Sequence, residues 1–330
     1  MNGRDSICAK SNSCIRATLH TTAHLRRLPQ FIKMAASTPI AKNTPVNSET
    51  TYSTIDPRIY ILNNNTQRAF NLQVLDLQQA LFMDDDTKEQ QFLDLGCGTG
   101  DFTRDHLLPR CAPLRRMVAV DISEEMVEYA KKNFAHPKIC YDVLDISGNG
   151  VADFVKRYGQ FDRVYSFHCL HRMNDQGTVL KNIAELLKPG GGCLLLFGAL
   201  SSGMNLNKKL ATMDHWKKYR KVFENTIPPS GDLVSRDALL SYMLNLLKNA
   251  GLVPTTCELL QKPPMLSSLE EKTRFLVTMN CLSAVVTEEE KPLLLKDVSE
   301  YTARLWAAGK AGSSPLPPCM FLVRAHKPRP

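Results

Sequence analysis

Short apolar runs alternate with amphipathic stretches through most of this chain. The runs have the length and residue content of buried strands, at Gln91–Leu95, Met117–Ile122, Ile139–Leu144, Phe161–Phe167, Gly192–Leu200, Val253–Leu260 and Cys319–Ala325. Helical periodicity predicts helices between or beside them, at Thr66–Met83, Asp101–Leu107, Glu124–Phe134, Val151–Tyr158, Gln176–Leu187 and Ser235–Asn249. This order predicts an α/β fold: a doubly wound, mostly parallel seven-stranded sheet with helices on both faces.

Two further helical stretches exceed what such a sheet requires. Met204–Phe223 predicts an inserted helix, and Ser267–Ala308 separates the last two strands where a hairpin would be enough. The second stretch and its approach carry large apolar residues, among them Met265, Phe275 and Trp306. Two interpretations remain open for it: a cover over a substrate, or an ordinary packing face between helices.

The sequence FLDLGCGTGDF, residues 92–102, breaks an apolar strand with three closely spaced glycines. Gly96, Gly98 and Gly100 would let a ligand lie against bare backbone. The dinucleotide-binding fingerprint, counted from Gly96, requires its third glycine where this chain has Asp101. An acid at that place would repel a pyrophosphate. The turn therefore predicts a cationic or zwitterionic ligand rather than NAD.

Two acids stand at the ends of the next strands. Asp121 closes the apolar run MVAVDIS about twenty residues after the turn, where an acid can bond ribose hydroxyls. Asp145 and Ile146 close the strand that follows, so one acid is expected at a ribose and the other at an adenine edge. Because ligands of doubly wound sheets collect at the carboxyl ends of the strands, we expect the turn and both acids to form one site.

This ordered set of motifs resembles the class I S-adenosylmethionine-dependent methyltransferases, whose first motif is similar to LDLGCGTG and whose second strand ends in an acid. The likeness extends over residues 90–200. It implies S-adenosyl-L-methionine as the cofactor, with Ser166 near its methionine portion. The implied cofactor-binding residues are Gly96, Cys97, Gly98, Gly100, Asp121, Ile122, Asp145, Ile146 and Ser166.

The segment FDRVYSFHCLHRMNDQ, residues 161–176, is similar to the juvenile hormone acid O-methyltransferases of insects and arachnids. With VDISEEMVEYA upstream, the likeness extends over residues 56–325. These enzymes make methyl esters of sesquiterpenoid acids, and their early Tyr, Asn and Gln have counterparts at Tyr60, Asn64 and Gln67. The resemblance implies an apolar carboxylic acid as substrate, with Gln67 holding its carboxylate.

The family's tryptophan after CLH is replaced here by Arg172. An indole offers one donor and an apolar wall, whereas a guanidinium offers a charged fork. Two orientations remain open: Arg172 turned inward, where we expect it to contact one oxygen of the carboxylate, or Arg172 pointing to solvent. An inward arginine makes the terpenoid specificity of the relatives uncertain for this chain.

His168 and His171 distinguish the remaining hypotheses. A carboxyl methyltransferase needs no general base, because the acid is already ionised near neutrality, and the two histidines would then shape the pocket. In a methyltransferase of amines or phenols, His168 or His171 would act as the base. A protein that binds the cofactor without catalysis is a third hypothesis.

Composition limits the compartment and the partners. No apolar run approaches the ~18 residues that span a bilayer. The formal net charge is +8, but residues 1–33 hold six basic residues against one acid, and removing that +5 leaves +3. Nucleic acid is therefore not predicted as a partner. Ten cysteines without a C-x-x-C pair predict reduced thiols and neither a zinc site nor a disulfide framework.

Residues 1–50 are rich in Ser, Thr, Asn and Arg and almost lack acids. We expect a disordered basic leader there and a methyltransferase domain over residues 51–330. Two interpretations of the leader remain open. It resembles a mitochondrial transit peptide. Alternatively, translation starts at Met34 and the protein is cytoplasmic.

Overall fold

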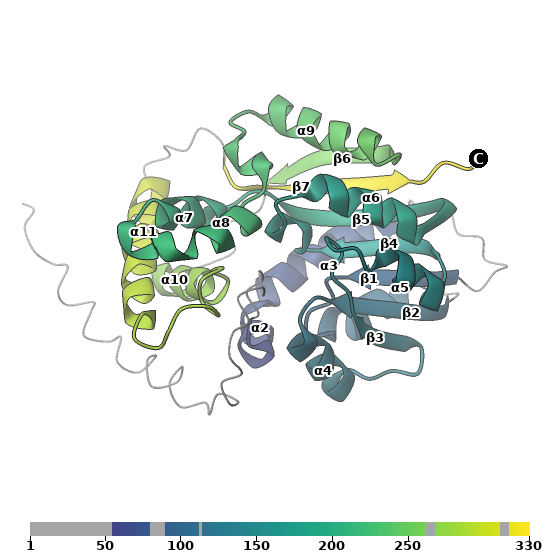
Figure 1. Cartoon of the computed structure of the whole chain (residues 1–330), viewed down its shortest axis with the longest axis horizontal. Coiled ribbons are helices and arrows are strands. Elements are labelled where there is room, and N and C mark those ends of the chain that lie inside the picture. Colours follow the sequence, from purple (N-terminus) through teal and green to yellow (C-terminus); the bar gives the residue numbers. More distant parts are fainter. Residues whose placement is uncertain (1–54, 80–89, 112–113, 262–267, 311–316) are drawn as a thin grey trace, which may run out of the picture. The chain divides into compact units, whose positions relative to one another are not determined.

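The computed structural model describes residues 55–79, 90–111, 114–261, 268–310 and 317–330. Its sheet has seven strands in the order β3-β2-β1-β4-β5-β7-β6 (Figure 1). The strands are β1 (Gln90–Leu95), β2 (Leu114–Asp121), β3 (Ile139–Val143), β4 (Phe161–Phe167), β5 (Leu187–Leu200), β6 (Val253–Gln261) and β7 (Cys319–His326). Strands β1 to β5 run parallel, and β7 is antiparallel to both its neighbours. The predicted doubly wound, mostly parallel sheet is confirmed.

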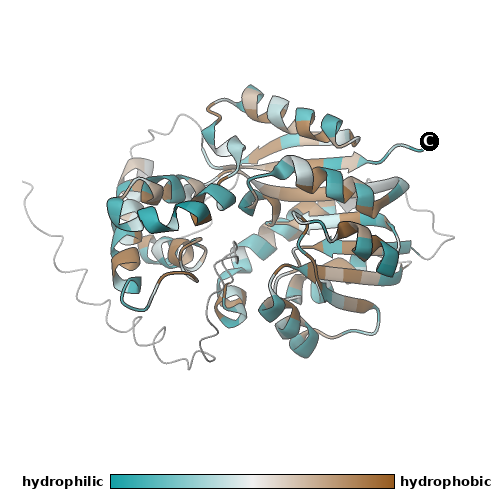
Figure 2. Ribbon diagram, viewed as in Figure 1, coloured by the Kyte–Doolittle hydropathy of each residue, from teal (hydrophilic) through white to brown (hydrophobic). Residues whose placement is uncertain are grey.

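Alternating side chains give the sheet two apolar faces, and the strands carry mostly hydrophobic residues (Figure 2). The helices against it are α3 (Asn65–Gln79), α4 (Glu124–Asn133), α5 (Val151–Tyr158), α6 (Gln176–Leu186) and α9 (Arg236–Asn249). Val118 and Val120 of β2 belong to the core shared with α5, α6 and α9. Met117 and Ala119 point to the other face, toward α3 and α4. Both faces are therefore covered, as the apolar runs predict.

The helices begin and end close to the predicted residues. Ser123 caps α4 by accepting a hydrogen bond from the Met126 backbone N–H. Helix α3 ends at Gln79, and the rest of the prediction, residues 80–83, lies outside the described residues. After the glycines the chain forms a short π-helix, η2 (Thr103–Leu107), in which the N–H of Leu108 donates to the Thr103 carbonyl. The predicted leader, residues 1–50, also lies outside the described residues.

The prediction of one inserted helix over Met204–Phe223 is wrong. The chain forms α7 (Ser202–Ala211), a 3-10 segment η5 (Asp214–Tyr219) and α8 (Arg220–Thr226). Met213 is extended between them. This break lets Trp216 reach a fully buried position, where its indole N–H donates to Asp297 at 2.8 Å. Long-range packing therefore overrides the local helical periodicity.

The second insertion forms α10 (Leu269–Thr278) and α11 (Lys291–Lys310). It packs with α7, η5 and α8 around an apolar cluster of its own, which includes Leu206, Trp216, Phe223, Leu276 and Val298. Hydrogen bonds of Trp216 to Asp297 and of Asn280 to Asn207 join the two insertions. We call these five elements the helical layer. Figure 1 shows the layer at the end of the sheet where the parallel strands terminate.

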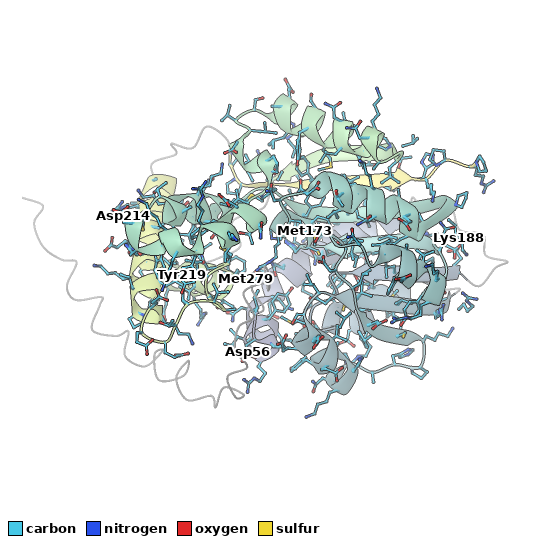
Figure 3. The ribbon with its side chains drawn as sticks, viewed as in Figure 1. Asp56, Met173, Lys188, Asp214, Tyr219 and Met279 are labelled. Carbon is cyan, nitrogen blue, oxygen red and sulfur yellow. The ribbon has the colours of Figure 1, made fainter. Side chains whose placement is uncertain are left out.

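Side chains mark the two ends of the sheet (Figure 3). Lys188 lies at the end remote from the helical layer, whereas Met173, after β4, and Met279, after α10, lie where the layer and the sheet approach each other. Helix α2 (Pro57–Asn63) contacts both α4 and α10, and so bridges the sheet and the helical layer. No helix in the described part of the chain is long and apolar enough to cross a membrane.

Candidate functional site

The glycine turn after β1 has a backbone that other residues would strain. Gly96, Gly98 and Gly100 all have positive φ, at 78°, 55° and 77°. A Cβ at Gly96 would lie 2.6 Å from the Sγ of Cys169, and one at Gly100 would lie 2.8 Å from the Cβ of Ala130. Both positions therefore require glycine for conformation and for space. Together they bring bare backbone to the carboxyl end of the sheet.

Asp121, at the end of β2, holds this turn in place. One carboxylate oxygen accepts a hydrogen bond from the Gly98 N–H at 2.9 Å, and the other accepts from the Ser123 N–H at 3.1 Å. Burial raises the pKa of Asp121, while these backbone donors and the positive charge of Arg172 act to lower it. Each oxygen keeps a lone pair that can accept from a hydroxyl of a bound ligand. The position therefore suits the predicted ribose contact.

The other predicted cofactor residues differ in what their side chains can offer. Asp145 accepts hydrogen bonds from the N–H and hydroxyl of Ser147, which fixes its carboxylate at the end of β3. Ile146 is buried in the core, whereas Ile122 is half-buried. Ser166 is buried, and its hydroxyl donates to the Leu95 carbonyl at 2.8 Å, which joins β4 to β1. The hydroxyl proton of Ser166 is thus used within the sheet, and its oxygen can only accept from a ligand.

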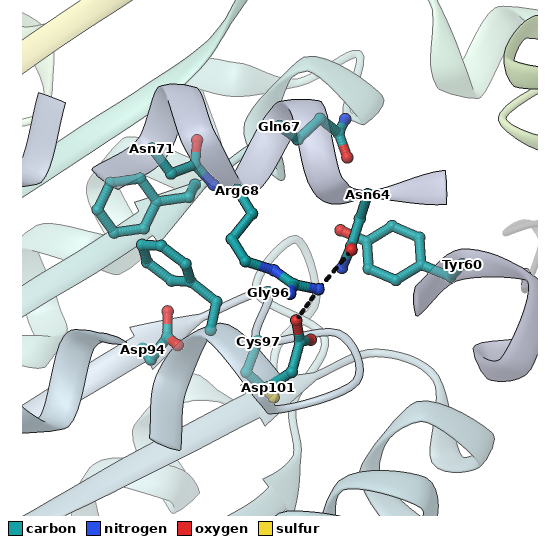
Figure 4. Close-up of a pocket in the computed structure, with 11 residues that line it drawn as sticks. Tyr60, Asn64, Gln67, Arg68, Asn71, Asp94, Gly96, Cys97 and Asp101 are labelled. Atoms are coloured by element: carbon teal, nitrogen blue, oxygen red, sulfur yellow. Dashed lines mark hydrogen bonds and ion pairs between the residues drawn. The ribbon is translucent and has the colours of Figure 1, made fainter. Parts of the chain in front are cut away.

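A small cavity of about 30 Å³ lies between the glycine turn and the helices α2 and α3 (Figure 4). It brings together the family residues Tyr60, Asn64 and Gln67 with Gly96 and Cys97 of the turn. The remaining lining residues are Arg68, Asn71, Asp94, Asp101, Phe102 and Phe167. The structure therefore places the early Tyr-Asn-Gln segment beside the glycine turn, which the sequence spacing alone did not predict.

Arg68 supplies a positive charge inside this cavity. Its guanidinium lies 2.6 Å from the Asp101 carboxylate and donates to the Asn64 side chain at 2.8 Å (Figure 4). On the same wall, the buried side-chain oxygens of Gln67 and Asn71 have no hydrogen-bond partner among the described residues. Unpaired buried acceptors are costly, so these two oxygens are suited to a ligand with N–H donors. A cation beside open acceptors fits the two ends of an α-amino acid group.

Asp94 is a polar residue of this cavity that the sequence analysis missed. It is buried within β1 and accepts a hydrogen bond from the Thr103 hydroxyl at 2.6 Å. Burial raises the pKa of Asp94 to about 7, although that hydrogen bond lowers it. The sequence feature that could have identified Asp94 is an acid inside an apolar run, but that run was interpreted only as a strand. Arg68 was also missed, because only the tertiary structure brings it to Asp101.

The chain leaves β4 through a strained residue. His168 has a φ of 54°, the only positive value at a non-glycine position among the described residues. Cys169 then lies against Gly96, and the 3-10 segment η4 (Leu170–Arg172) follows. The rings of His168 and His171 meet edge to face at 6.3 Å, and His171 packs beside Gly198. The structure thus brings the two predicted histidines together after the end of β4, with His171 against β5.

Arg172 is half-buried, and its charge acts on four groups near the end of the sheet. Burial raises the pKa of Tyr60 and that of Cys169, and the positive charge of Arg172 lowers both. The same charge acts on Asp121 beneath the site and on Cys281 in the helical layer. Arg172 therefore acts electrostatically both on groups around the glycine turn and on a group of the helical layer.

No group of three or more His, Cys, Asp or Glu side chains is placed to hold a metal ion in the parts of the chain that the structure describes.

Comparison with known proteins agrees with this geometry. Residues 92–191 match a family model described as a methyltransferase domain. A juvenile hormone acid O-methyltransferase of Drosophila melanogaster is 36% identical over 159 residues, 48% of this chain and 53% of the relative. A protein of the same name from Bombyx mori is 36% identical over 142 residues, 42% of this chain and 49% of the relative. The chain spans about half the length of these curated relatives.

A solved structure supports the fold. It is phosphoethanolamine N-methyltransferase 2 of Haemonchus contortus, in complex with phosphomonomethylethanolamine and S-adenosylhomocysteine. The TM-score is 0.50 at 19% identity, and the match covers 88% of this chain and 62% of that chain. The likeness extends to the fold alone.

Proposed function

We propose, from the premise that residues 92–191 form a class I methyltransferase domain whose cofactor is S-adenosylmethionine, that this protein methylates the carboxylate of an apolar acid. The observation that carries the proposal is the polar cavity beside the glycine turn, where Arg68 and the open oxygens of Gln67 and Asn71 suit an amino acid group. Asp121, on the other side of Gly98, suits a ribose. The distribution of polar groups thus matches a nucleoside joined to an amino acid.

The cofactor would be held by residues of three elements. We assign the ribose to Asp121, and the adenine edge to Asp145 and the backbone at Ile146. Arg68 would take the carboxylate of the methionine portion, and the side-chain oxygens of Gln67 and Asn71 its ammonium. Gly96, Cys97, Gly98 and Gly100 would pass beneath it, with Ile122 beside the adenine and Ser166 supporting the turn through Leu95. When bound, S-adenosylmethionine supplies an electrophilic methyl group on a positively charged sulfur.

The acceptor carboxylate would be positioned by Gln67 and Arg172. The Gln67 amide has donors as well as an acceptor, so it can serve the carboxylate while its oxygen faces the cofactor. Arg172 is expected to contact one carboxylate oxygen only, because a grip on both would occupy the lone pair that attacks. A positive charge at Arg172 opposes a protonated amine acceptor, which favours the carboxylate over the amine hypothesis.

The residues of this site would promote the reaction by alignment and by excluding water. An acid is ionised near neutrality and needs no general base, so His168 and His171 are assigned to shaping the pocket. The attacking oxygen, the methyl carbon and the sulfur must lie nearly in line. Opposite charges disappear as the reaction proceeds, so a dry site favours it over the solvated reactants.

The helical layer is proposed to be the substrate cover. It stands at the carboxyl ends of the parallel strands, and helix α2, which carries Tyr60, contacts α10 of the layer. Met173 and Met279 lie where the layer approaches the sheet, and flexible apolar side chains of this kind suit a hydrocarbon chain. The names of the two insect relatives support an acid acceptor.

A labelled methyl group provides the test. The protein is incubated with methyl-labelled S-adenosylmethionine and a panel of fatty and terpenoid acids, together with the amine and the alcohol of each carbon chain. We expect label in a base-labile methyl ester of at least one acid and none in the amines. Asp121→Asn is the control that should strongly lower ester formation when S-adenosylmethionine is limiting. Label on an amine, or no product from a protein that binds adenosylhomocysteine, would contradict the proposal.

A further inference from the structure

Arg172 occupies a connection between the glycine turn and the helical layer. Cys169, three residues before it, lies against Gly96, and its carbonyl accepts the Arg172 N–H at 3.1 Å. On the other side, the Asn174 N–H donates to the Asn225 carbonyl of α8 at 3.2 Å. The arginine is therefore fixed between two anchors, one on the turn and one on the layer.

The charge of Arg172 is poorly compensated. Arg68 forms an ion pair with Asp101, but no salt bridge joins Arg172 to an acid in the described ranges. The charge of Arg172 acts on three neutral groups, those of Tyr60, Cys169 and Cys281. It also acts on Asp121, whose carboxylate already accepts hydrogen bonds from two backbone N–H groups. Arg172 therefore carries a positive charge without a salt-bridge partner among the described residues, on a segment that is fixed against the glycine turn.

We propose that Arg172 makes the cofactor site at the glycine turn and Asp121 discriminate between ligands by their charge. Until an acceptor anion is present, this site would bind the sulfonium cofactor less favourably than its neutral thioether product. The inference rests on the proposed function, because it assumes that S-adenosylmethionine occupies this site. Like charges repel in a partly buried site, and the acceptor carboxylate brings the negative charge that cancels the repulsion. A tryptophan at this position would carry no charge and could not produce the effect.

The balance of charge over the reaction gives the consequence. A carboxylate lone pair forms the new O–CH₃ bond while the S–CH₃ bond breaks and its electron pair returns to sulfur. Anion and sulfonium become a neutral ester and a neutral thioether, and no proton moves. After transfer, the ester has no charge to hold it at Arg172, whereas S-adenosylhomocysteine no longer meets the repulsion. The ester is expected to leave readily and the thioether to bind more tightly than S-adenosylmethionine.

Calorimetric titration without an acceptor tests this inference. Dissociation constants for S-adenosylmethionine and S-adenosylhomocysteine are measured at pH 8 for the wild type, Arg172→Gln and Arg172→Lys. We expect Arg172→Gln to lower the dissociation constant of S-adenosylmethionine, divided by that of S-adenosylhomocysteine, by about 10-fold. This is the order of magnitude for one pair of like charges in a partly buried site. Arg172→Lys should keep the ratio. Arg220→Gln is the matched control, because Arg220 is exposed and pairs only with Glu224 on the surface of α8.

The outcomes separate this inference from the proposed function. A ratio that falls in Arg172→Gln, with S-adenosylhomocysteine affinity unchanged, supports it. An unchanged ratio in Arg172→Gln overturns the inference but does not contradict the proposed function. Loss of both ligands in Arg172→Gln also overturns it, because Arg172 would then act through structure rather than charge. Failure of the wild type to bind either ligand overturns the proposed function as well.

Discussion

The guanidinium of Arg68 lies 2.6 Å from the carboxylate of Asp101, inside the cavity next to the glycine turn. Asp101 is the residue that separates this turn from a dinucleotide fingerprint. Its pairing with a cation from α3, beside the open oxygens of Gln67 and Asn71, creates a small region with both signs of charge. Such a region suits a zwitterion, which is the character of the methionine end of the proposed cofactor.

Removal of Arg68 should affect one end of the ligand only. We expect Arg68→Ala to weaken binding of S-adenosylhomocysteine about 30-fold, because a charge-assisted hydrogen bond contributes about 2 kcal/mol. Methylthioadenosine lacks the amino acid end, and its affinity should not change. Calorimetry with both ligands measures this. Arg58→Ala is the control, since Arg58 is exposed and pairs with Asp56 at the start of its own helix, α2. Equal losses for the two ligands would remove Arg68 from the assigned role.

Asp121 should act on the opposite end. We expect Asp121→Asn to weaken S-adenosylhomocysteine and methylthioadenosine alike, each by roughly 30-fold or more, because both contain the ribose. The substituted amide would also turn an N–H group toward Gly98 or Ser123, whose N–H groups now donate to the carboxylate. Titration of the two nucleosides provides the measurement. Undiminished affinity for both would exclude Asp121 from the ribose contact.

Asp94 should make stability depend on pH. Burial raises its pKa to about 7 in the folded protein, above the value near 3.9 in an unfolded chain. Between these values the folded state keeps a proton that the unfolded chain has released, so stability falls as pH rises. We expect the wild type to lose roughly 3 kcal/mol relative to Asp94→Asn between pH 5 and pH 8. Urea unfolding at the two pH values measures it, and parallel changes in the two proteins would disprove the assignment.

Gly100 should tolerate substitution worse than a glycine with the same φ elsewhere. Gly100 and Gly159 both have a φ of 77°. A Cβ at Gly100 would lie 2.8 Å from Ala130 and 2.9 Å from the Tyr141 hydroxyl, whereas nothing lies within 4 Å at Gly159. We expect Gly159→Ala to cost about 1 kcal/mol from backbone strain and Gly100→Ala about 2 kcal/mol more from the clash. Equal unfolding free energies in denaturant would show that the neighbours of Gly100 move aside.

Much of the fold follows from local sequence patterns. Apolar runs bounded by turn residues predict all seven strands, and Ser123 and Ser235 mark the starts of α4 and α9. These signals depend on residues that are adjacent in the chain. The break inside Met204–Phe223 depends instead on Trp216 and Asp297, which are 81 positions apart. Helical periodicity contains no information about such a contact.

The candidate site was predictable in part for the same reason. Gly96, Gly98 and Asp121 belong to short motifs at strand ends. In the structure, a hydrogen bond joins Gly98 to Asp121. Arg68 and Asp94 have no motif of their own. Arg68 gains its place because α3 crosses the glycine turn, and Asp94 becomes polar lining because β1 ends at the same cavity.

The central claim is that the glycine turn, Asp121 and the Arg68 cavity hold one adenosyl amino acid. A crystal structure of the protein with S-adenosylhomocysteine tests it most directly. We expect the ribose within hydrogen-bonding distance of Asp121 and the amino acid end at Arg68. A groove that stays empty at saturating ligand, or a nucleoside bound away from Asp121, would contradict it.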